Sequence, residues 1–459
     1  MKVALFNTLT RSKEELRPIE PPKLGLYTCG PTVYNFQHVG NYRTYVFEDV
    51  LKRSLNLLGY KVLHVMNITD VGHLVSQGDE GEDKMEVGAA REGKTAWEIA
   101  ELYTQAFKKD CAELHILPPD VLCKATDHIK EQVELVLRLE KKGFIYKTSD
   151  GLYFDTEKFP AYGALVGAGH LEGLKAGARV EANPEKKSNT DFAVWKFSPA
   201  GKRRQMEWDS PWGKGFPGWH IECSAMAMRY LGETFDIHCG GVDHIPIHHT
   251  NEIAQTEAAT GKPFVRVWMH AEFLLMNNAK MAKSEGGFVT LAHLKDKGFD
   301  PLDYRYHCLT AHYRKQLDFS WESLESSKTA RRRLKESAAL LKDAAPSPTC
   351  ADFEIAFKES LADDLNVPGA LAAVWDCLKS DLPAGARLRM LRIAEETLGL
   401  GLFAEDKAEL PPAALALLER RAKARQDKDF ALADKLRQEL EAMGIIVEDG
   451  KQGQKWRKK

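Results

Sequence analysis

The feature that most constrains the fold is a strand–helix–strand pattern over residues 24–67. The run KLGLYTC is a short apolar strand that ends at Cys29. After Asn41, apolar residues recur at the spacing of one helix face, and they are Phe47, Val50, Leu51, Leu55 and Leu58. Gly59 ends this helix, and KVLHVMNIT is the next β-rich run. A crossover of this kind predicts parallel strands, and therefore an α/β sheet of the nucleotide-binding type.

The chain is too long for one hydrophobic core. Its 459 residues correspond to roughly three or four domains at about 100–200 residues each. Strand and helix patterns of the α/β kind fill residues 1–120 and resume from 205, with an apparent insertion of a helix and short strands over 121–204. After about residue 320 the segments follow helical periodicity, and the C-terminal tail combines helix with the short strand-like run IIVEDG.

The composition limits the classes of protein that the chain can belong to. A charged fraction of 28% with 9% aromatic residues excludes a disordered chain, a collagen and a mucin-like stalk. No uncharged apolar run approaches the ~20 residues that span a bilayer, and the N-terminus lacks the apolar region of a secretory signal. The eight cysteines are irregularly spaced and form no CxxC pair. We therefore expect a cytoplasmic protein with free thiols and no membrane partner.

The loop GPTVYNFQHVGNYR, which precedes the first helix, is a candidate phosphate-binding loop. Gly30 and Pro31 predict a tight turn, and Gly40 with Asn41 opens a helix whose N-terminal amides attract phosphate. His38 lies just before that helix and could donate a hydrogen bond to a phosphate oxygen as charge develops there. A structural histidine beside a capping asparagine is the alternative interpretation of the same pattern.

A second loop, NNAKMAKSEGG, carries Lys280 and Lys283. Two lysines on a flexible loop suit a triphosphate, because they can follow its charge as it moves. A solvated surface loop is the alternative, since most pairs of lysines at this spacing face water.

Histidines and cysteines cluster in the second half of the α/β region. Five of the fifteen histidines fall within thirty residues, and they are His220, His238, His244, His248 and His249. His248 and Glu252 stand four residues apart, on one face of a helix. Together with Cys223 they offer imidazole, carboxylate and thiolate, which are all zinc ligands. Cys29 could supply a fourth ligand if the end of its strand adjoins the cluster.

The spacing alone leaves other ligand sets open. His249 with Glu252, or His244 with Cys239, could serve as well, and simple packing of these side chains is the remaining alternative. A mixed site of cysteine, histidine and carboxylate would suit a zinc ion that keeps one coordination position open for a substrate.

In combination, the segments TCGPTVYNFQHVGN, NITD, GWHIECSAM, HHTNE and KMAKS resemble, in this order, the bacterial cysteinyl-tRNA synthetases, which are class I aminoacyl-tRNA synthetases. The resemblance covers nearly the whole chain, including GLYFDTEKFPAYG, SLADDLNVPGAL and the tail KDFALADKLRQEL. It implies a Rossmann-type catalytic domain with an insertion, then an α-helical bundle and a small mixed α/β anticodon-binding domain. The implied segments are the two halves of the catalytic domain (1–120 and 205–270), the connective insertion (121–204), the KMSKS-loop and stem-contact region (271–322), the helical bundle (323–403) and the anticodon-binding domain (404–459).

The resemblance also implies roles for individual residues. The catalytic residues would be His38, Asn41, Lys280 and Lys283. The residues that bind ATP, as its magnesium complex, would be Gly30, Pro31, Thr32, His38, Gly40, Asn41, Asp243, Lys280 and Lys283. The substrate cysteine would lie against Thr69, Trp219 and His238. One zinc ion per chain would be held by Cys29, Cys223, His248 and Glu252.

The implied activity is that of a cysteine–tRNA ligase. L-Cysteine reacts with ATP to give cysteinyl-adenylate and pyrophosphate, and the cysteinyl group then passes to the terminal ribose 2′-hydroxyl of tRNA(Cys). A pocket that measures only size separates cysteine from serine or alanine by about 1–3 kcal/mol. Direct binding of a soft thiolate to zinc discriminates further. The resemblance implies a monomer.

The C-terminal tail is the candidate contact for tRNA. The net charge of the chain is −2, but residues 415–459 hold twelve Lys and Arg against eight Asp and Glu. This basic excess, with Trp456 to stack on an unpaired base and Arg457 beside it, fits anticodon recognition. A solvated charged helix is the alternative.

Two other functions remain to be separated from the first. A ligase that joins activated cysteine to a small amine, as in mycothiol synthesis, would share the catalytic motifs and zinc but lack the anticodon region. A non-catalytic, zinc-stabilised RNA-binding protein would leave both His38 and the lysine loop without a role.

Overall fold

The structure is a computed structural model, and it describes residues 1–72, 83–167, 183–199, 201, 204–276, 279–280, 288–347, 350–404, 412–427, 429–450 and 453–458. The chain divides into two compact units, Met1–Leu402 and Phe403–Lys459. All eight cysteines lie in the described ranges and are free thiols, as expected. No helix in these ranges is both long and apolar enough to cross a membrane.

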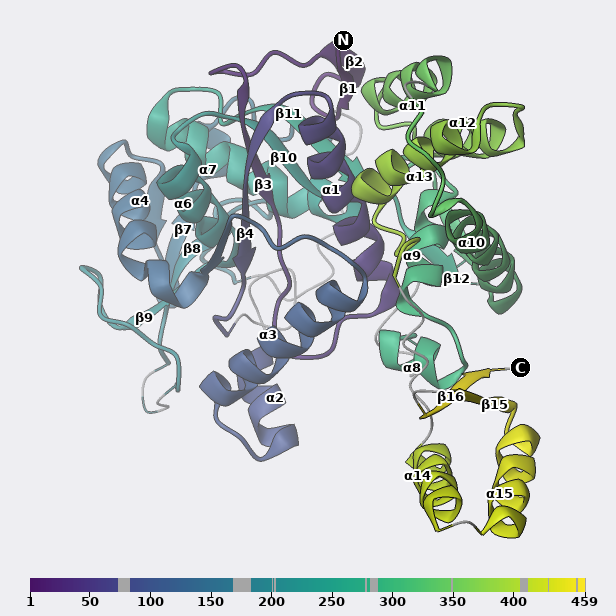
Figure 1. Cartoon of the computed structure of the whole chain (residues 1–459). Helices are drawn as coiled ribbons and strands as arrows, with labels where there is room; N and C mark the ends of the chain where they lie inside the picture. The colour runs from purple at the N-terminus through teal and green to yellow at the C-terminus, as the bar shows by residue number, and fades with distance from the viewer. Residues whose placement is uncertain are drawn as a thin grey trace. The chain divides into compact units, whose positions relative to one another are not determined.

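A parallel sheet forms the centre of the first unit (Figure 1), with the strand order β11-β10-β3-β4-β5. The predicted strand–helix–strand unit is confirmed, because β3 pairs in parallel with β4 and α1 (Val39–Leu57) connects them. The expected Rossmann-type sheet is therefore present. Its strands are β3 (Lys23–Thr28), β4 (Lys61–Ile68), β5 (Val121–Lys124), β10 (Phe235–Gly241) and β11 (Val265–Ala271).

Strand β10 is the neighbour of β3, although the two are far apart in sequence. Leu26 lies opposite Ile237, and Thr28 lies opposite Cys239. Since β11 also pairs in parallel with β10, the carboxyl ends of three adjacent strands meet at one edge. Open parallel sheets bind their ligands beyond this edge, so the fold itself indicates where a site lies.

The apolar face of α1 packs into the main hydrophobic core. Val46 and Val50 are 1% exposed, and the ring of Phe47 stacks on Tyr313 with centroids 4.5 Å apart. The helix begins at Val39 rather than at Gly40 and Asn41, because His38 caps it. The predicted apolar stripe is thus correct, and the helix that carries it begins one residue before the predicted start at Gly40.

The insertion contains an antiparallel sheet with the order β6-β7-β8-β9. Leu152, Phe154, Val194 and Trp195 from this sheet are buried in a separate core cluster, together with residues of α4 and α6. Strand β5 belongs to the parallel sheet, and β9 pairs with β8 beyond residue 204; the division into named domains stays a prediction. The elements are α4 (Ile129–Lys141), β6 (Ile145–Lys147), β7 (Gly151–Phe154), β8 (Phe192–Phe197), β9 (Gly215–Pro217) and α6 (Trp219–Leu231).

The other elements of the first unit surround these sheets. Those before the predicted bundle are β1 (Ala4–Asn7), β2 (Ser12–Glu15), α2 (Lys84–Glu92), α3 (Ala96–Glu113), α7 (Thr250–Thr260), β12 (Leu274–Met276), β13 (Ala279–Lys280), α8 (Leu291–Asp296), α9 (Pro301–Leu309) and β14 (Leu317–Phe319). The helical texture predicted after residue 320 is confirmed by α10 (Trp321–Leu341), α11 (Ala351–Ala362), α12 (Val367–Lys379) and α13 (Ala384–Leu398).

The second unit is mixed α/β, as expected. It contains α14 (Pro412–Gln426), α15 (Phe430–Ala442) and an antiparallel hairpin of β15 (Ile445–Gly450) and β16 (Gly453–Lys458). Arg421 is 1% exposed and makes two hydrogen bonds to the Asp449 carboxylate. Trp456 is partly buried against the core of this unit, and the side chain of Arg457 lies outside the described residues. Their contact with tRNA stays a prediction.

A buried ion pair joins α1 to the helices around it. The carboxylate of Asp49 contacts the guanidinium of Arg305, and both side chains are 0% exposed. Arg305 also donates to the carbonyl oxygens of Leu398 and Leu114, at 2.6 and 2.9 Å. The backbone N–H of Leu117 donates to the other oxygen of Asp49 at 2.9 Å. The position of α1 therefore depends on charges that water does not reach.

Replacing Arg305 by methionine should lower the free energy of unfolding by about 3 kcal/mol, the lower end of the cost of breaking a buried ion pair, because Asp49 loses its fully buried charge partner and keeps only Arg53. Urea denaturation followed by circular dichroism measures the change. Lys2→Ala is the control, since Lys2 pairs with Glu15 while its own side chain is 84% exposed; its cost should stay within about 0.5 kcal/mol. Equal effects of the two substitutions would contradict a structural role for the buried pair.

Candidate active site

The loop after β3 runs directly against the end of β4. The backbone N–H of Gly30 donates to Oδ1 of Asn67 at 2.9 Å, and the N–H of Thr69 donates to the carbonyl of Pro31 at 3.0 Å. A Cβ atom added at Gly30 would lie 1.7 Å from the backbone oxygen of Asn67. Only glycine fits this position, so the predicted turn follows from a close approach between two strand ends.

His38 and Asn41 form a reciprocal cap at the start of α1. Nδ1 of His38 accepts from the backbone N–H of Asn41 at 3.2 Å, and Oδ1 of Asn41 accepts from the N–H of His38 at 3.2 Å. Because Nδ1 is an acceptor, a neutral ring carries its proton on Nε2. A Cβ at Gly40 would lie 3.0 Å from this ring, so Gly40 leaves the space that the cap requires.

A cavity of about 400 Å³ opens beyond the carboxyl ends of the parallel strands. It brings together most of the residues predicted for ATP and for the amino acid. Those that line it are Gly30, Pro31, Thr32, His38, Gly40, Asn41, Asp243, Thr69 and Trp219. Three of the four predicted zinc ligands, Cys29, Cys223 and His248, line the same cavity. The residues predicted to bind ATP and cysteine and the residues predicted to bind zinc therefore border the same cavity.

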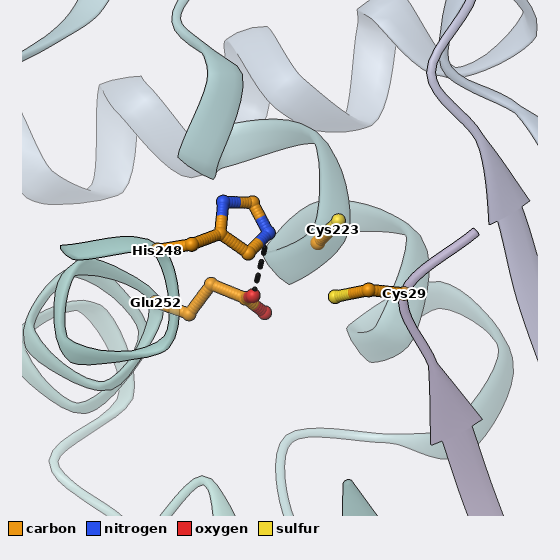
Figure 2. A group of neighbouring side chains, drawn as sticks. All are labelled: Cys29, Cys223, His248 and Glu252. Atoms are coloured by element: carbon orange, nitrogen blue, oxygen red, sulfur yellow. Dashed lines mark ion pairs between the residues drawn. The ribbon is translucent and has the colours of Figure 1, made fainter. Parts of the chain in front are cut away.

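The four predicted metal ligands converge on one point (Figure 2). Cys29 follows β3, Cys223 lies in α6, and His248 and Glu252 lie at the junction into α7. Their ligand atoms all lie within 4.8 Å of one another, and all four residues are buried. Nε2 of His248 is 3.0 Å from Oε1 of Glu252. Two thiols, an imidazole and a carboxylate at this separation fit a zinc ion.

A second group overlaps the first. It consists of Cys29, Glu252, His238 and His249, with ligand atoms equally close. His249 and His238 do not line the cavity, whereas His248 and Cys223 do. The pairing of His244 with Cys239 occurs in neither group found among the described residues. The cavity therefore favours the first group for an ion that must meet a substrate.

The electrostatics of the first group suit a cation. Burial alone would raise the pKa of Glu252, but His238 and His248 lower it to about 2. A hydrogen bond from Cys29, with the nearby His248, lowers the pKa of the Cys223 thiol to about 7 against the effect of burial. Burial alone would lower the pKa of His248, but Glu252 and Cys223 raise it to about 10. The negative charges of Glu252 and Cys223 thus hold a proton on His248, in a position that a metal ion could take, while burial raises the pKa of the fourth ligand, Cys29.

Other histidines hold these ligands in place. Nε2 of His238 lies 3.1 Å from Oε2 of Glu252, and its ring stacks on Trp268 with centroids 4.7 Å apart. His238 is fully buried and does not line the cavity, so it contacts Glu252 and does not lie beside the cavity residues Thr69 and Trp219 with which it was predicted to hold the substrate cysteine. Nε2 of His249 lies 3.3 Å from Sγ of Cys29. Each of these two histidines therefore contacts a candidate metal ligand without lining the cavity itself.

Most of the lysine loop lies outside the described residues. For Lys280 the structure describes only the backbone, in β13, and Lys283 lies outside the described residues. Their roles toward ATP stay predictions.

Sequence reasoning missed part of the cavity wall. Glu272, Phe273 and Leu274 follow β11 and line the cavity, and Tyr34 and Gln37 line it from the loop before α1. The missed residues beyond β11 could have been found from the rule that ligands bind at the carboxyl ends of parallel strands.

Comparison with known proteins gives consistent similarities. A family model described as the catalytic domain of "tRNA synthetases class I (C)" matches residues 15–329. A second, described as the cysteinyl-tRNA ligase anticodon binding domain, matches residues 407–457. The chain is 51% identical to cysteine–tRNA ligase 1 of Burkholderia lata over 99% of this chain and 97% of that protein. It is 46% identical to the cysteine–tRNA ligase of Treponema denticola over the full length of both.

Solved structures show a similar fold at low sequence identity. Methionyl-tRNA synthetase of Mycobacterium tuberculosis, crystallised with methionyl-adenylate, has a TM-score of 0.56 and 16% identity over 90% of this chain and 96% of that chain. The likeness extends the class I synthetase architecture to most of the described fold.

Gly30→Ala should damage the site, because the new methyl group would collide with the backbone of Asn67. We expect a loss of about 1–3 kcal/mol in unfolding free energy and a displaced loop that impairs ATP binding, measured by urea denaturation and calorimetric titration. Gly25→Ala in β3, the strand that leads into this loop, is the matched control, since its Cβ would meet Leu231 at 3.4 Å, an ordinary contact. If both variants behaved like the parent, the close approach at Gly30 would not matter to the site.

Proposed function

The chain belongs to the cysteine–tRNA ligase family of class I aminoacyl-tRNA synthetases, and we propose that it joins L-cysteine to tRNA(Cys) in a reaction that consumes ATP. One observation carries this proposal. A single cavity is lined both by the phosphate-binding loop of α1 and by three of the four candidate zinc ligands. Such an arrangement holds a nucleotide and a thiol-bearing amino acid side by side, as adenylate formation requires.

In the first step, the carboxylate of cysteine attacks the α-phosphorus of ATP and pyrophosphate departs. The cap of α1 leaves Nε2–H of His38 to donate toward added negative charge, and the positive end of the helix dipole adds to this attraction. Asp243, which lines the cavity, would accept hydrogen bonds from the ribose hydroxyls of ATP. Lys280 and Lys283 would neutralise the departing pyrophosphate together with the magnesium ion that accompanies ATP.

Zinc held by Cys29, Cys223, His248 and Glu252 would select the substrate by ligating its thiolate, which a serine hydroxyl cannot match. The protein's part is to hold these ligands rigidly. His238 contacts one oxygen of Glu252, and the ring of Trp219 packs against His248 at a tilt of 35°, with centroids 4.4 Å apart. Trp219 and Thr69 line the cavity beside this group, where they would enclose the side chain of cysteine and exclude bulkier amino acids.

In the second step, the terminal 2′-hydroxyl of tRNA attacks the carbonyl of the adenylate, the bond between that carbonyl carbon and the phosphate oxygen breaks, and AMP departs with the ester formed. The match of residues 407–457 to an anticodon-binding domain supports a tRNA acceptor over a small amine. It also disfavours a non-catalytic RNA-binding role, which would not need the nucleotide cavity. A monomer in the cytoplasm remains our expectation.

The test is cysteine-dependent exchange of pyrophosphate into ATP, followed by attachment of labelled cysteine to tRNA(Cys). We expect both activities, with serine supporting neither. Exchange without transfer to tRNA would favour the small-amine ligase. The absence of both activities in zinc-loaded protein would refute an enzymatic role.

A pair of neighbouring histidine variants tests the zinc assignment. His248→Ala should lose most of the ion after dialysis, whereas His249→Ala should retain about one zinc per chain, because a residue that only supports a ligand lowers affinity by about 10–100-fold. Plasma mass spectrometry measures the metal, and circular dichroism checks the fold. The reverse result, with zinc lost from His249→Ala and kept by His248→Ala, would assign the site to the second group of ligands.

A further inference from the structure

An aromatic side chain stands in solvent next to the cavity. Phe36 is 48% exposed and directly precedes Gln37 and His38, which both line the cavity. Phe36 itself is not among the lining residues. Its ring therefore lies outside the cavity proposed for ATP and cysteine. Phe36 is two residues before His38, which caps α1 at that cavity.

The exposed ring is held in place from one side. Tyr103 of α3 meets it edge to face, with centroids 5.0 Å apart and an angle of 89° between the rings. Tyr103 is 3% exposed, and its hydroxyl accepts from Nη2 of Arg91 at 2.9 Å and donates to Glu92 at 3.2 Å. The support beneath Phe36 is thus buried and hydrogen-bonded, so the ring is pre-organised.

The same contacts tie helices α2 and α3 to the loop that carries Phe36. Nη2 of Arg91 also donates to the carbonyl oxygen of Tyr34 at 3.3 Å, and a Cβ at Gly88 would lie 3.3 Å from that oxygen. Figure 1 shows α2 and α3 as two adjacent helices, and they pack on each other. The side chain of Arg91 is 43% exposed and pairs with Glu92 at the surface. The charge of Arg91 is therefore balanced by Glu92, and the exposed ring of Phe36 is the feature that can meet a ligand here.

We propose that Phe36 is a positioning residue for tRNA, on which an unpaired base at the 3′ end stacks while the terminal ribose enters the cavity. The inference rests on the proposed function and adds a site to it. The terminal 2′-hydroxyl must reach the adenylate, so the preceding unpaired nucleotides must lie just outside the cavity. Every base offers a π-face to an exposed ring, so stacking on Phe36 does not depend on which base stands there.

The decisive experiment compares two reactions of the zinc-loaded, full-length protein. Phe36→Ala should leave cysteine-dependent exchange of pyrophosphate unchanged, because exchange needs no tRNA. In a single turnover from preformed cysteinyl-adenylate, transfer to limiting tRNA(Cys) should fall about 10- to 100-fold, and saturating tRNA should recover part of the loss. Phe36→Trp should retain transfer, whereas Phe36→Leu, which keeps the apolar surface without the ring, should resemble the alanine variant.

Ile355→Ala is the control, since Ile355 is 49% exposed on α11 and has no place in the site; both reactions should remain at parental level. Unchanged transfer by Phe36→Ala would overturn the inference while leaving the ligase function intact. Reduced exchange would overturn it too, because Phe36 would then act on ATP or cysteine. Failure of the parent protein to charge tRNA would instead refute the proposed function.

The tryptophan variant provides a direct measurement of stacking. The emission of the added tryptophan, obtained by subtracting the fluorescence of the parent from that of Phe36→Trp, should be quenched when tRNA(Cys) binds. A tRNA that lacks its last four nucleotides should bind without this quenching. Equal quenching by the truncated tRNA would show that another part of the RNA covers the ring, and would reject the assignment to the 3′ end.

Discussion

The site depends on the parallel pairing of β3 with β10. This pairing places the end of β3 beside β10, which lies some two hundred residues later in the chain. It also brings Sγ of Cys29 to 3.3 Å from Nε2 of His249, 220 residues away in sequence. Neither half of the domain contains the site alone. The nucleotide loop and one thiol come from the first half, while Cys223, His248 and Glu252 come from the second. The local geometry of the site is therefore a property of the assembled sheet.

Helix α1 transmits this arrangement to the remainder of the first unit. Its start is capped by His38 and Asn41 at the cavity, and its middle is held by the buried contact of Asp49 with Arg305 of α9. Arg305 reaches the end of α13 through the carbonyl of Leu398. The loop before α1, helix α9 and the end of α13 thus all meet one helix, whose position is set by packing and by the buried charges of Asp49 and Arg305.

Local patterns predicted much of this structure. The apolar stripe of α1, the glycine turn at Gly30 and the spacing of His248 and Glu252 each encode their own geometry over a few residues. Sequence spacing could not distinguish His248 from His249 as the ligand, because both lie four or fewer residues from Glu252. The structure distinguishes them, since only His248 of the two lines the cavity. Phe36 was also invisible to sequence patterns, since its exposure depends on where α3 places Tyr103.

The reciprocal cap at the start of α1 has a consequence for how this family member can vary. One imidazole both closes the first turn of the helix and presents a proton toward the cavity, and the asparagine that completes the cap fixes which nitrogen bears that proton. Stability and chemistry are therefore inherited together at these two positions. A replacement of His38 or Asn41 that keeps the proton facing the cavity must therefore also rebuild the start of the helix.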